Sequence, residues 1–278
     1  MKGDTFMKKK ILALLAATSL SMFALTGCGE QTPTASGDLK QIKVGATPVP
    51  HAEMLEQIKD DLKNDGVALE IVEFNDYVQP NLALNDKELD ANFFQHQPYL
   101  DDFVKEHQEL KLTSAGGIHI EPMGIYSKKI QKLEDLASGA TVSIPNDPTN
   151  GGRALLLLEK AGLLKLKEGV GEKATPQDIV ENSKNLQIQE LEAAQVPRTL
   201  EDVDIAIINT NFAMQVNLVP TKDALFMEDS TSPYVNIVAV RQGDENRDEI
   251  KALMKELKSD KIKKFIEEKY KGEVVPAF

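Results

Sequence analysis

Residues 42–74, IKVGATPVPHAEMLEQIKDDLKNDGVALEIVEF, decide the fold. Ile42–Ala46 is a short apolar run, His51–Asn64 carries apolar residues at helical spacing, and Val67–Phe74 alternates in the manner of a strand. A strand, a helix and a second strand in this order are typical of parallel strands joined by a crossover helix. This segment therefore predicts an α/β fold with a sheet covered by helices on both faces.

Strands and helices continue to alternate along the rest of the chain. A short helix is expected after Pro80, and further elements follow as strands (Ala91–Phe94, Leu110–Ala115, Thr141–Ile144, Leu186–Leu191, Ile205–Ile208, Tyr234–Arg241) and helices (Pro98–Glu106, Asn150–Ala161, Thr175–Glu181, Asp248–Tyr270). We expect two lobes, each with a central β-sheet flanked by helices, formed by residues 39–122 with 235–278 and by residues 123–234. Residues 118–127 could cross between the lobes, and the C-terminal helix would return to the first one.

The N-terminus has the layout of a secretory signal peptide. Lys8–Lys10 precede an apolar run over Ile11–Leu25, which is shorter than the roughly 20 residues that a membrane-spanning helix needs. The sequence Leu-Thr-Gly-Cys that ends at Cys28 resembles the bacterial lipobox. Residues 1–27 are therefore expected to be cleaved, Cys28 to carry lipid, and residues 28–38 to form a flexible linker.

Charge and cysteine content exclude several classes of protein. The chain has 278 residues, 44 Asp and Glu against 32 Lys and Arg, and a net charge of −12. Nucleic-acid binding depends on neutralising phosphates with Lys and Arg, so no nucleic-acid partner is expected. Because Cys28 is the only cysteine, neither an internal disulfide nor a cysteine-cluster metal site can form.

Residues that follow predicted strands should form the site, because ligands bind outside the carboxyl ends of strands in open α/β sheets. Thr47-Pro48, Asn75-Asp76-Tyr77, Gln95-His96 and Asn146–Asn150 hold these positions. They mix aromatic rings with uncharged hydrogen-bonding groups. Such a mixture suits a small molecule with a polar head and an apolar tail, and Tyr77, Phe94, His96 and Tyr99 could wall its apolar part.

The segment 145–158, PNDPTNGGRALLLL, is the most informative one for the site. Thr149 or Asn150 is expected to cap a helix whose first turn holds Arg153, where a cation opposes the helix dipole and calls for an anion nearby. Backbone N–H groups, glycines and Arg153 together predict a carboxylate-sized anion site. An ion pair between Arg153 and a surface acid is the alternative.

Catalytic and metal-binding patterns are weak. The expected folded part has no cysteine nucleophile and no Gly-x-Ser-x-Gly elbow. His119 and Glu121 alternate on an expected strand and could offer two metal ligands on one face, with His51 or His96 as a third. No His-x-x-x-His pair supports this metal site. We therefore expect neither an enzyme nor a bound cofactor, and keep a metal-ion receptor as the alternative function.

Seven motifs make the sequence resemble the methionine-binding lipoproteins that serve ABC importers. They are FNDYVQPN (74–81), DANFFQHQPYL (90–100), YSKKI (126–130), PNDPTNGGRALLLLEKAGL (145–163), ELEAAQVPR (190–198), INTNFA (208–213) and SPYVN (232–236). The resemblance runs from residue 42 to residue 278. It implies a type II-like periplasmic-binding-protein fold whose two lobes close on L-methionine, D-methionine or a methionine dipeptide.

The resemblance also implies roles for individual residues. Arg153 would pair with the ligand carboxylate, Asn150 would help at the helix terminus, and Asn209 and Asn236 would hold the amino-acid backbone groups. The thioether pocket would be lined by Tyr77, Phe94, His96 and Tyr99. An ABC permease and its ATPase would be the partners, and lipid at Cys28 would anchor the protein on the outer or periplasmic side of the cell membrane. A lipid-anchored hydrolase of small amides is a further alternative.

Overall fold

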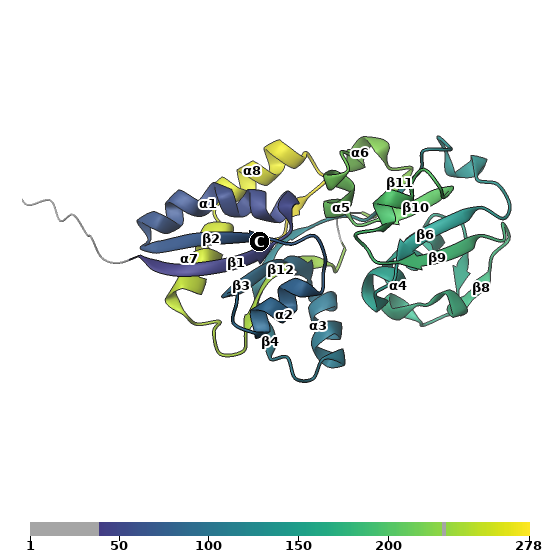
Figure 1. The fold of residues 1–278 in the computed structure, drawn as a ribbon. Coiled ribbons are helices and arrows are strands. Elements are labelled where there is room, and N and C mark those ends of the chain that lie inside the picture. The colour runs from purple at the N-terminus through teal and green to yellow at the C-terminus, as the bar shows by residue number, and fades with distance from the viewer. Residues whose placement is uncertain (1–38, 230–231) are drawn as a thin grey trace, which may run out of the picture. The chain divides into compact units, whose positions relative to one another are not determined.

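The computed structural model describes residues 39–229 and 232–278. The expected signal peptide, the lipidation site Cys28 and the linker lie outside these residues. Within the described chain, no helix has the length and apolar character needed to cross a bilayer. Two main β-sheets, each covered by helices on both faces, organise the fold (Figure 1).

The first sheet has six strands in the order β13-β4-β12-β3-β1-β2. Its strands are β1 (Lys40–Ala46), β2 (Val67–Glu73), β3 (Ala91–His96), β4 (Leu112–Ile120), β12 (Val235–Arg241) and β13 (Val275–Pro276). β1 pairs in parallel with β2 and β3, as the opening segment of the sequence predicts. β12 runs antiparallel to both β3 and β4, so the completed sheet is mixed.

Helices cover both faces of this sheet, and neighbouring residues of β3 show how the faces are divided. Phe93 packs with α1, α7 and α8, whereas Phe94 packs with α2 and α3, because successive side chains of a strand point to opposite faces. Figure 1 shows α1 beside α8 over one side of the strands and α2 beside α3 on the other. The helical elements are η1 (Pro48–Ala52), α1 (Glu53–Asn64), α2 (Gln79–Asn85), α3 (Gln97–Glu106), α7 (Asp248–Leu257) and α8 (Asp260–Tyr270).

The second sheet has five strands in the order β11-β5-β10-β6-β9. They are β5 (Gly124–Tyr126), β6 (Thr141–Pro145), β9 (Gln187–Leu191), β10 (Ile205–Ile208) and β11 (Phe226–Met227). β6 pairs in parallel with β9 and β10, and β5 is antiparallel to β10 and β11. Apolar side chains of α4 (Pro148–Lys160) pack on one face, and those of η5 (Val196–Thr199) and α5 (Thr210–Gln215) belong to the core on the other.

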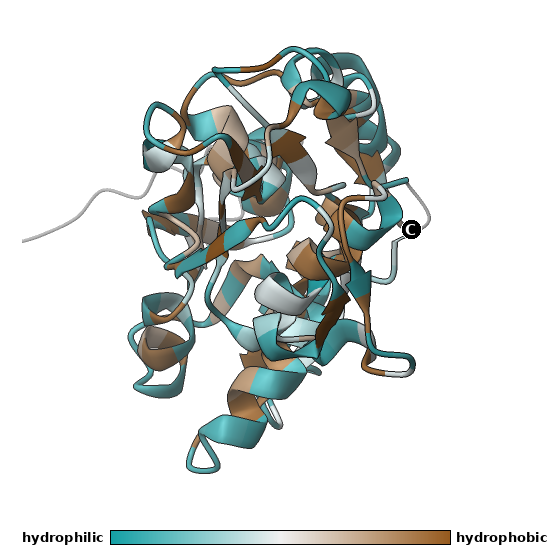
Figure 2. Cartoon of the chain, turned by 90° about the vertical axis from the view of Figure 1, so that its right-hand side faces the viewer, coloured by the Kyte–Doolittle hydropathy of each residue, from teal (hydrophilic) through white to brown (hydrophobic). Residues whose placement is uncertain are grey.

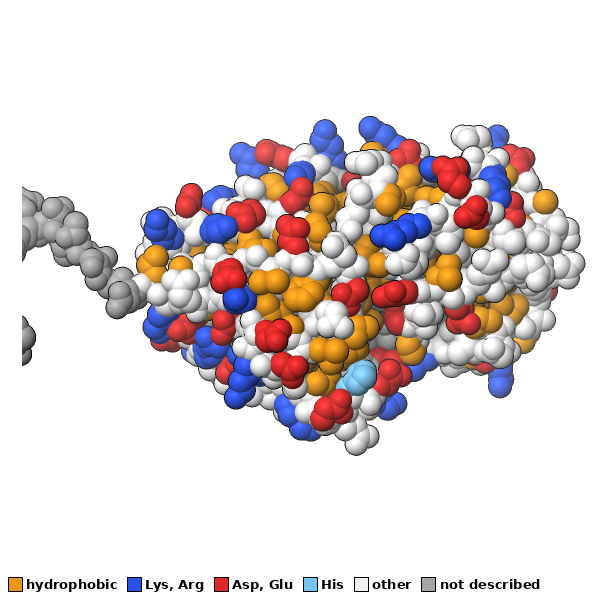
Figure 3. Space-filling model, in the orientation of Figure 1, with side chains coloured by type: hydrophobic (Ala, Val, Ile, Leu, Met, Phe, Trp, Pro, Cys, Tyr) orange, Lys and Arg blue, Asp and Glu red, His pale blue; other side chains and the backbone are white. Residues whose placement is uncertain are grey.

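Short elements complete this part of the chain. They are β7 (Lys165–Leu166), which pairs with β8 (Ile179–Glu181), the single helical turns η2 (Leu133–Asp135), η3 (Gly171–Lys173) and η4 (Pro176–Asp178), and α6 (Pro220–Asp223). Apolar residues concentrate on the strands and on the inward faces of the helices (Figure 2). On the face shown in Figure 3, acidic and basic side chains are interspersed, without a continuous basic patch.

Two predicted helices are wrong. Thr175–Glu181 forms the short turn η4 and then β8, because the β-branched pair Ile179 and Val180 lies in a strand that pairs with β7. Asp248–Tyr270 is two helices rather than one. Ser259 breaks it, since its side chain accepts the N–H of Ile262 and so caps a new helix.

Two strands extend beyond their predicted ends. The strand predicted at Ala91–Phe94 continues to His96, so Gln95 and His96 are the last two residues of β3 rather than residues that follow it. The strand predicted at Leu110–Ala115 continues to Ile120, with a register shift against β12 on either side of Gly116-Gly117. Glu121 therefore lies one residue beyond the end of β4. These extensions carry polar residues to the strand ends where the site is formed.

Candidate functional site

A pocket lies at the strand ends, with an empty volume of about 320 Å³ that includes open solvent. All eight residues that the sequence assigns to ligand binding line it. The full lining is Tyr77, Phe94, Gln95, His96, Tyr99, Glu121, Asn150, Arg153, Asn209, Thr210, Asn211 and Asn236. It combines residues at the ends of β3, β4 and β10 and on β12 with residues of α3, α4 and α5 and with Tyr77 in the loop after β2.

Three aromatic rings form the apolar wall. Ring centroids lie 5.8 Å apart for Tyr77 with Phe94 and for Tyr77 with Tyr99, and 6.1 Å apart for Phe94 with Tyr99. The Tyr99 hydroxyl donates to the backbone oxygen of Tyr77 at 3.0 Å, and the Tyr77 hydroxyl donates to Oδ1 of Asn211 at 2.6 Å. With their hydroxyls bonded in this way, the tyrosines keep a fixed orientation.

The helix that bears Arg153 begins earlier than the sequence predicts. Asp147, rather than Thr149 or Asn150, is the N-cap, and its carboxylate accepts the backbone N–H of Asn150 at 2.9 Å. Pro148 takes the first helical position, where proline is favoured. Arg153 is thus in the second turn of α4 rather than in the first, where the sequence predicted it to oppose the helix dipole.

The two glycines of this helix permit close backbone approaches. A Cβ atom on Gly151 would lie 2.9 Å from the backbone oxygen of Pro145, and one on Gly152 would overlap the backbone oxygen of Glu172. Both glycines are buried and allow the first turns of α4 to pack against β6 and η3. The glycines therefore set how α4 is seated, and with it the position of Arg153.

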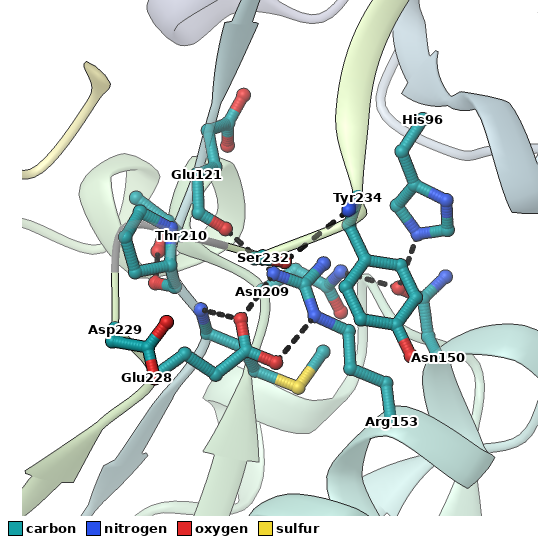
Figure 4. Close-up of polar contacts among 12 residues, drawn as sticks. His96, Glu121, Asn150, Arg153, Asn209, Thr210, Glu228, Asp229, Ser232 and Tyr234 are labelled. Carbon is teal, nitrogen blue, oxygen red and sulfur yellow. Dashed lines mark hydrogen bonds and ion pairs between the residues drawn. The ribbon is translucent and has the colours of Figure 1, made fainter. Parts of the chain in front are cut away.

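Arg153 is held by an ion pair that the sequence did not identify. Its Nε and Nη2 atoms lie 2.8 and 2.5 Å from the two carboxylate oxygens of Glu228, and Nη2 also donates to the backbone oxygen of Glu121 at 2.7 Å (Figure 4). The guanidinium carbon lies 4.1 Å from the ring centroid of Tyr234. The expected alternative, an ion pair, is therefore present, but its acid is the largely buried Glu228 rather than a surface residue.

An amide network surrounds Asn150. Its Oδ1 atom lies 2.7 Å from Nδ2 of Asn209 and 3.1 Å from Nε2 of His96, while its Nδ2 atom donates to Asp147 at 3.0 Å. Because Nδ1 of His96 accepts the backbone N–H of Tyr99, Nε2 carries the ring proton. Burial, with Arg153 nearby, lowers the pKa of His96 to about 3, so the imidazole is neutral.

Asn209 is left with a free acceptor. Its Nδ2 atom is used by Asn150, and its Oδ1 atom is buried with no hydrogen-bond partner among residues 39–229 and 232–278. Since an unpaired buried polar atom is costly, a ligand donor at this position would satisfy it. Nδ2 of Asn211 is likewise buried without a partner in the described chain, and it offers a donor.

Two histidines and a carboxylate meet beside the pocket. Oε1 of Glu121 lies 2.7 Å from Nε2 of His119 and 3.3 Å from Nε2 of His51. The sequence placed these three residues in one candidate metal site, and their ligand atoms do lie within 4.8 Å of one another. His96, the other candidate, belongs to the network around Asn150 instead. Burial lowers the pKa of His51 to about 4 and of His119 to about 3, so both rings are neutral.

Asn236 connects this cluster to the pocket. β12 places it opposite His96 on β3 and His119 on β4. Its Oδ1 atom lies 3.1 Å from Nε2 of His51, whose Nδ1 atom lies 2.7 Å from the hydroxyl of Thr47. The oxygen of Asn236 is thereby engaged, and its NH₂ group is what the residue can offer to a ligand.

Four lining residues were not assigned to the ligand by the sequence: Gln95, Glu121, Thr210 and Asn211. Gln95 bonds to Asn81 and Asn92, which fixes it in a buried network. Thr210 and Asn211 follow β10. Because ligands bind outside the carboxyl ends of strands, the strand predicted at Ile205–Ile208 could have identified both residues. Glu121 was considered only as a metal ligand, because the strand predicted at Leu110–Ala115 was not expected to continue to it.

Comparison with known proteins gives the family. The family model described as NlpA lipoprotein matches residues 42–278. The chain is 45% identical to the D-methionine-binding lipoprotein MetQ of Salmonella typhimurium, over 92% of this chain and 93% of the relative. It is 44% identical to the methionine-binding lipoprotein MetQ of Bacillus subtilis, over 97% of this chain and 99% of the relative.

Solved structures agree with the predicted fold class. A nutrient-binding protein from Burkholderia cenocepacia bound to methionine has a TM-score of 0.83 and 50% identity, covering 85% of this chain and all of its own. An ABC transporter periplasmic substrate-binding protein from Coxiella burnetii has a TM-score of 0.81 and 44% identity, with the same coverage. They confirm a two-lobed, type II-like binding-protein fold. From the family match and these relatives, the chain belongs to the NlpA lipoprotein family.

Proposed function

We propose that this protein is the substrate-binding lipoprotein of an ABC importer and that it captures methionine between two lobes. The lobes would be residues 39–122 with 235–278, and residues 123–234. The observation that carries the proposal is the pocket itself, which joins an aromatic wall to a guanidinium and several amide groups. A zwitterion with an apolar tail requires this combination. Relatives named for methionine binding, at 44–45% identity, support it.

The bonding pattern indicates where each part of methionine would lie. Glu228 and the backbone of Glu121 use two nitrogens of Arg153, which leaves Nη1 without a partner in the described chain and free for the ligand carboxylate. The NH₂ group of Asn236 could add a second donor, and Oδ1 of Asn209 an acceptor. The thioether would lie against Tyr77, Phe94, His96 and Tyr99, where a sulfur at a ring edge contributes roughly 0.3–1.5 kcal/mol.

Contacts between the proposed lobes would hold the closed form. The Tyr77 hydroxyl bonds to Asn211, and Lys173 of η3 pairs with Asp102 of α3. Closure would bury the ligand and present surfaces of both lobes to a permease and its ATPase. Lipid attached to Cys28 would keep the receptor at the outer or periplasmic face of the cell membrane. Replacing Cys28 by serine should release the protein from the membrane fraction.

A hydrolase is the less favoured alternative. Thr47 and His51 do form a hydroxyl–imidazole pair, at 2.7 Å, but Thr47 is fully buried and is not among the pocket-lining residues. A substrate in the pocket would not reach this hydroxyl. We therefore propose a receptor without catalytic activity, and turnover of a methionyl dipeptide by the purified protein would contradict this part of the proposal.

The direct test is to identify what the purified protein carries. The protein should be denatured, and the released small molecules analysed by mass spectrometry alongside elemental analysis of the intact sample. Methionine or a methionine dipeptide near one molecule per chain supports the proposal. A stoichiometric transition metal without methionine would instead favour the metal-ion receptor, for which the cluster of His51, His119 and Glu121 is the candidate site.

A further inference from the structure

The pocket holds a single acidic side chain among its described lining residues, Glu121, and a single basic one, Arg153. Arg153 already has Glu228 as its counter-ion. No Lys or Arg side chain of the described residues forms an ion pair with Glu121, whose carboxylate instead lies 2.7 Å from Nε2 of His119 and 3.3 Å from Nε2 of His51. A buried carboxylate without a cationic partner is costly, so this one calls for a positive charge from the ligand.

The hydrogen bonds around Glu121 favour its ionised form. With Nε2 of His119 donating to Oε1, the unpartnered Nδ1 atom of that ring is an acceptor. In the opposite tautomer, Nδ1–H would be a buried donor without a partner in the described chain, which is the rarer and costlier defect. His119 therefore donates to Oε1 of Glu121, and a hydrogen bond donated to a carboxyl oxygen favours its ionised form.

The Thr47 hydroxyl fixes the tautomer of His51, so that its Nε2 atom also carries the ring proton. Nε2 of His51 faces two oxygens, Oδ1 of Asn236 and Oε1 of Glu121, so it must carry the proton, and Nδ1 accepts from the Thr47 hydroxyl. Burial raises the pKa of Glu121, while His51, Arg153 and a backbone hydrogen bond with Asn211 act in the opposite direction. The cluster thus supplies several N–H groups to a carboxylate whose side chain is 7% exposed.

We propose that the carboxylate of Glu121 binds the α-ammonium group of the ligand and restricts the pocket to amino acids with a free, protonated amino group. This inference rests on the proposed function and names the ligand class that the site accepts. Glu121 would supply the charge, with Oδ1 of Asn209 as a further acceptor. His51 and His119 would be positioning residues that hold the carboxylate in place.

The test compares two ligands that differ only in the amino group. L-Methionine and its desamino analogue, 4-(methylthio)butanoic acid, should be titrated by calorimetry into wild-type protein stripped of bound ligand. We expect wild type to prefer methionine by at least about 100-fold, since a charged group loses its partner in the analogue. N-Acetyl-L-methionine should also bind at least about 100-fold more weakly than methionine.

The variant Glu121→Gln tests whether Glu121 causes the preference for methionine over its desamino analogue. Its affinity for methionine should fall at least about tenfold while its affinity for the desamino analogue changes less than about threefold, because only methionine presents an ammonium group. The matched control is Glu190→Gln, an equal change of charge at an exposed residue of β9 outside the pocket, which should bind both ligands as wild type does. Equal losses for both ligands in Glu121→Gln would contradict the inference.

The wild-type comparison keeps the inference open to refutation even if Glu121→Gln does not fold. Wild type that binds methionine and the desamino analogue equally well would overturn the role of Glu121 while leaving the proposed function intact. Wild type that binds neither ligand would instead count against the proposed function itself.

Discussion

Nε2 of His51 lies 3.1 Å from Oδ1 of Asn236, a residue 185 positions further along the chain. This bond turns the amide of Asn236 so that its oxygen faces the histidine and its NH₂ group is free. It joins η1, at the end of β1, to β12, and thereby connects the buried polar cluster to the pocket. Residues beyond the pocket wall should for this reason affect ligand binding.

Asn236→Ala should weaken methionine binding strongly. Losing one hydrogen bond to a charged ligand group costs about 1.5–3 kcal/mol, or roughly 10- to 150-fold in affinity. Calorimetry on stripped protein measures the change, and the melting temperature without ligand checks that the variant is folded. Unchanged affinity would show that Asn236 does not bind the ligand.

His51→Ala should act through Asn236 rather than independently. A double-mutant cycle of His51→Ala and Asn236→Ala should therefore give a coupling energy of about 1 kcal/mol in methionine binding. His51→Gln, whose amide N–H can replace Nε2–H, should recover part of the affinity. If the two losses simply add, the orienting role of His51 is wrong.

Arg153→Ala should reduce both stability and binding. It leaves Glu228 mostly buried without a counter-ion, which costs about 3 kcal/mol in the free energy of unfolding, and it removes the proposed partner of the ligand carboxylate. Urea denaturation gives the stability change. Adding Glu228→Gln to Arg153→Ala should restore much of the stability but not the affinity, and recovery of methionine binding in the double variant would refute the role of Arg153.

Acid should destabilise the protein below about pH 6.5. The folded protein holds the pKa of His51 at about 4 and of His96 and His119 at about 3, against about 6.5 in the unfolded chain. As the pH falls below 6.5, the unfolded state binds protons that the folded state does not, so the free energy of unfolding decreases. Each histidine contributes a slope of up to about 1.4 kcal/mol per pH unit between pH 6.5 and pH 4.

Two acids act in the opposite direction over part of this range. Burial raises the pKa of Glu121 and Asp147, so the folded protein takes up their protons more readily than the unfolded chain does. Urea titrations at half-unit pH steps should still show a net fall in stability, because three histidines oppose two acids. A His119→Gln variant should show a shallower fall, and stability that is flat from pH 7 to pH 5 would contradict the assignment of neutral, buried imidazoles.

Gly152→Ala should disturb the seating of α4. The added Cβ would overlap the backbone oxygen of Glu172, and backbone cannot move aside as a flexible side chain can. We expect a loss of about 2 kcal/mol or more in the free energy of unfolding, in the range typical of overpacking. Gly66→Ala is the comparison, since Gly66 has open space around it and a φ of +81°, and should cost only about 1 kcal/mol.

Much of the site could be predicted from the sequence because its residues lie at the ends of strands. Local periodicity located β1, β2, β3, β6 and β10, and the rule that ligands bind at strand ends then selected the segments around Tyr77, His96 and Asn150. Motifs shared with a known family added Asn209 and Asn236. These residues all meet at one pocket.

What the sequence missed depends on contacts between distant segments. Arg153 and Glu228 are 75 residues apart, and nothing in the local pattern of either one indicates the other. Glu121 was considered as a metal ligand but not as part of the pocket, because β4 continues past glycines that local propensity treats as a strand end. The N-cap was predicted at Thr149 or Asn150 rather than at Asp147, because all three residue types cap helices and the fold selects among them.

Calorimetry on ligand-stripped protein shows whether the pocket binds methionine. L-Methionine, D-methionine and glycyl-methionine should each be titrated into wild type and into Asn236→Ala. We predict that at least one of them binds wild type at one site per chain and binds the variant at least about tenfold more weakly. No binding of any of the three to folded, stripped wild type would contradict the account.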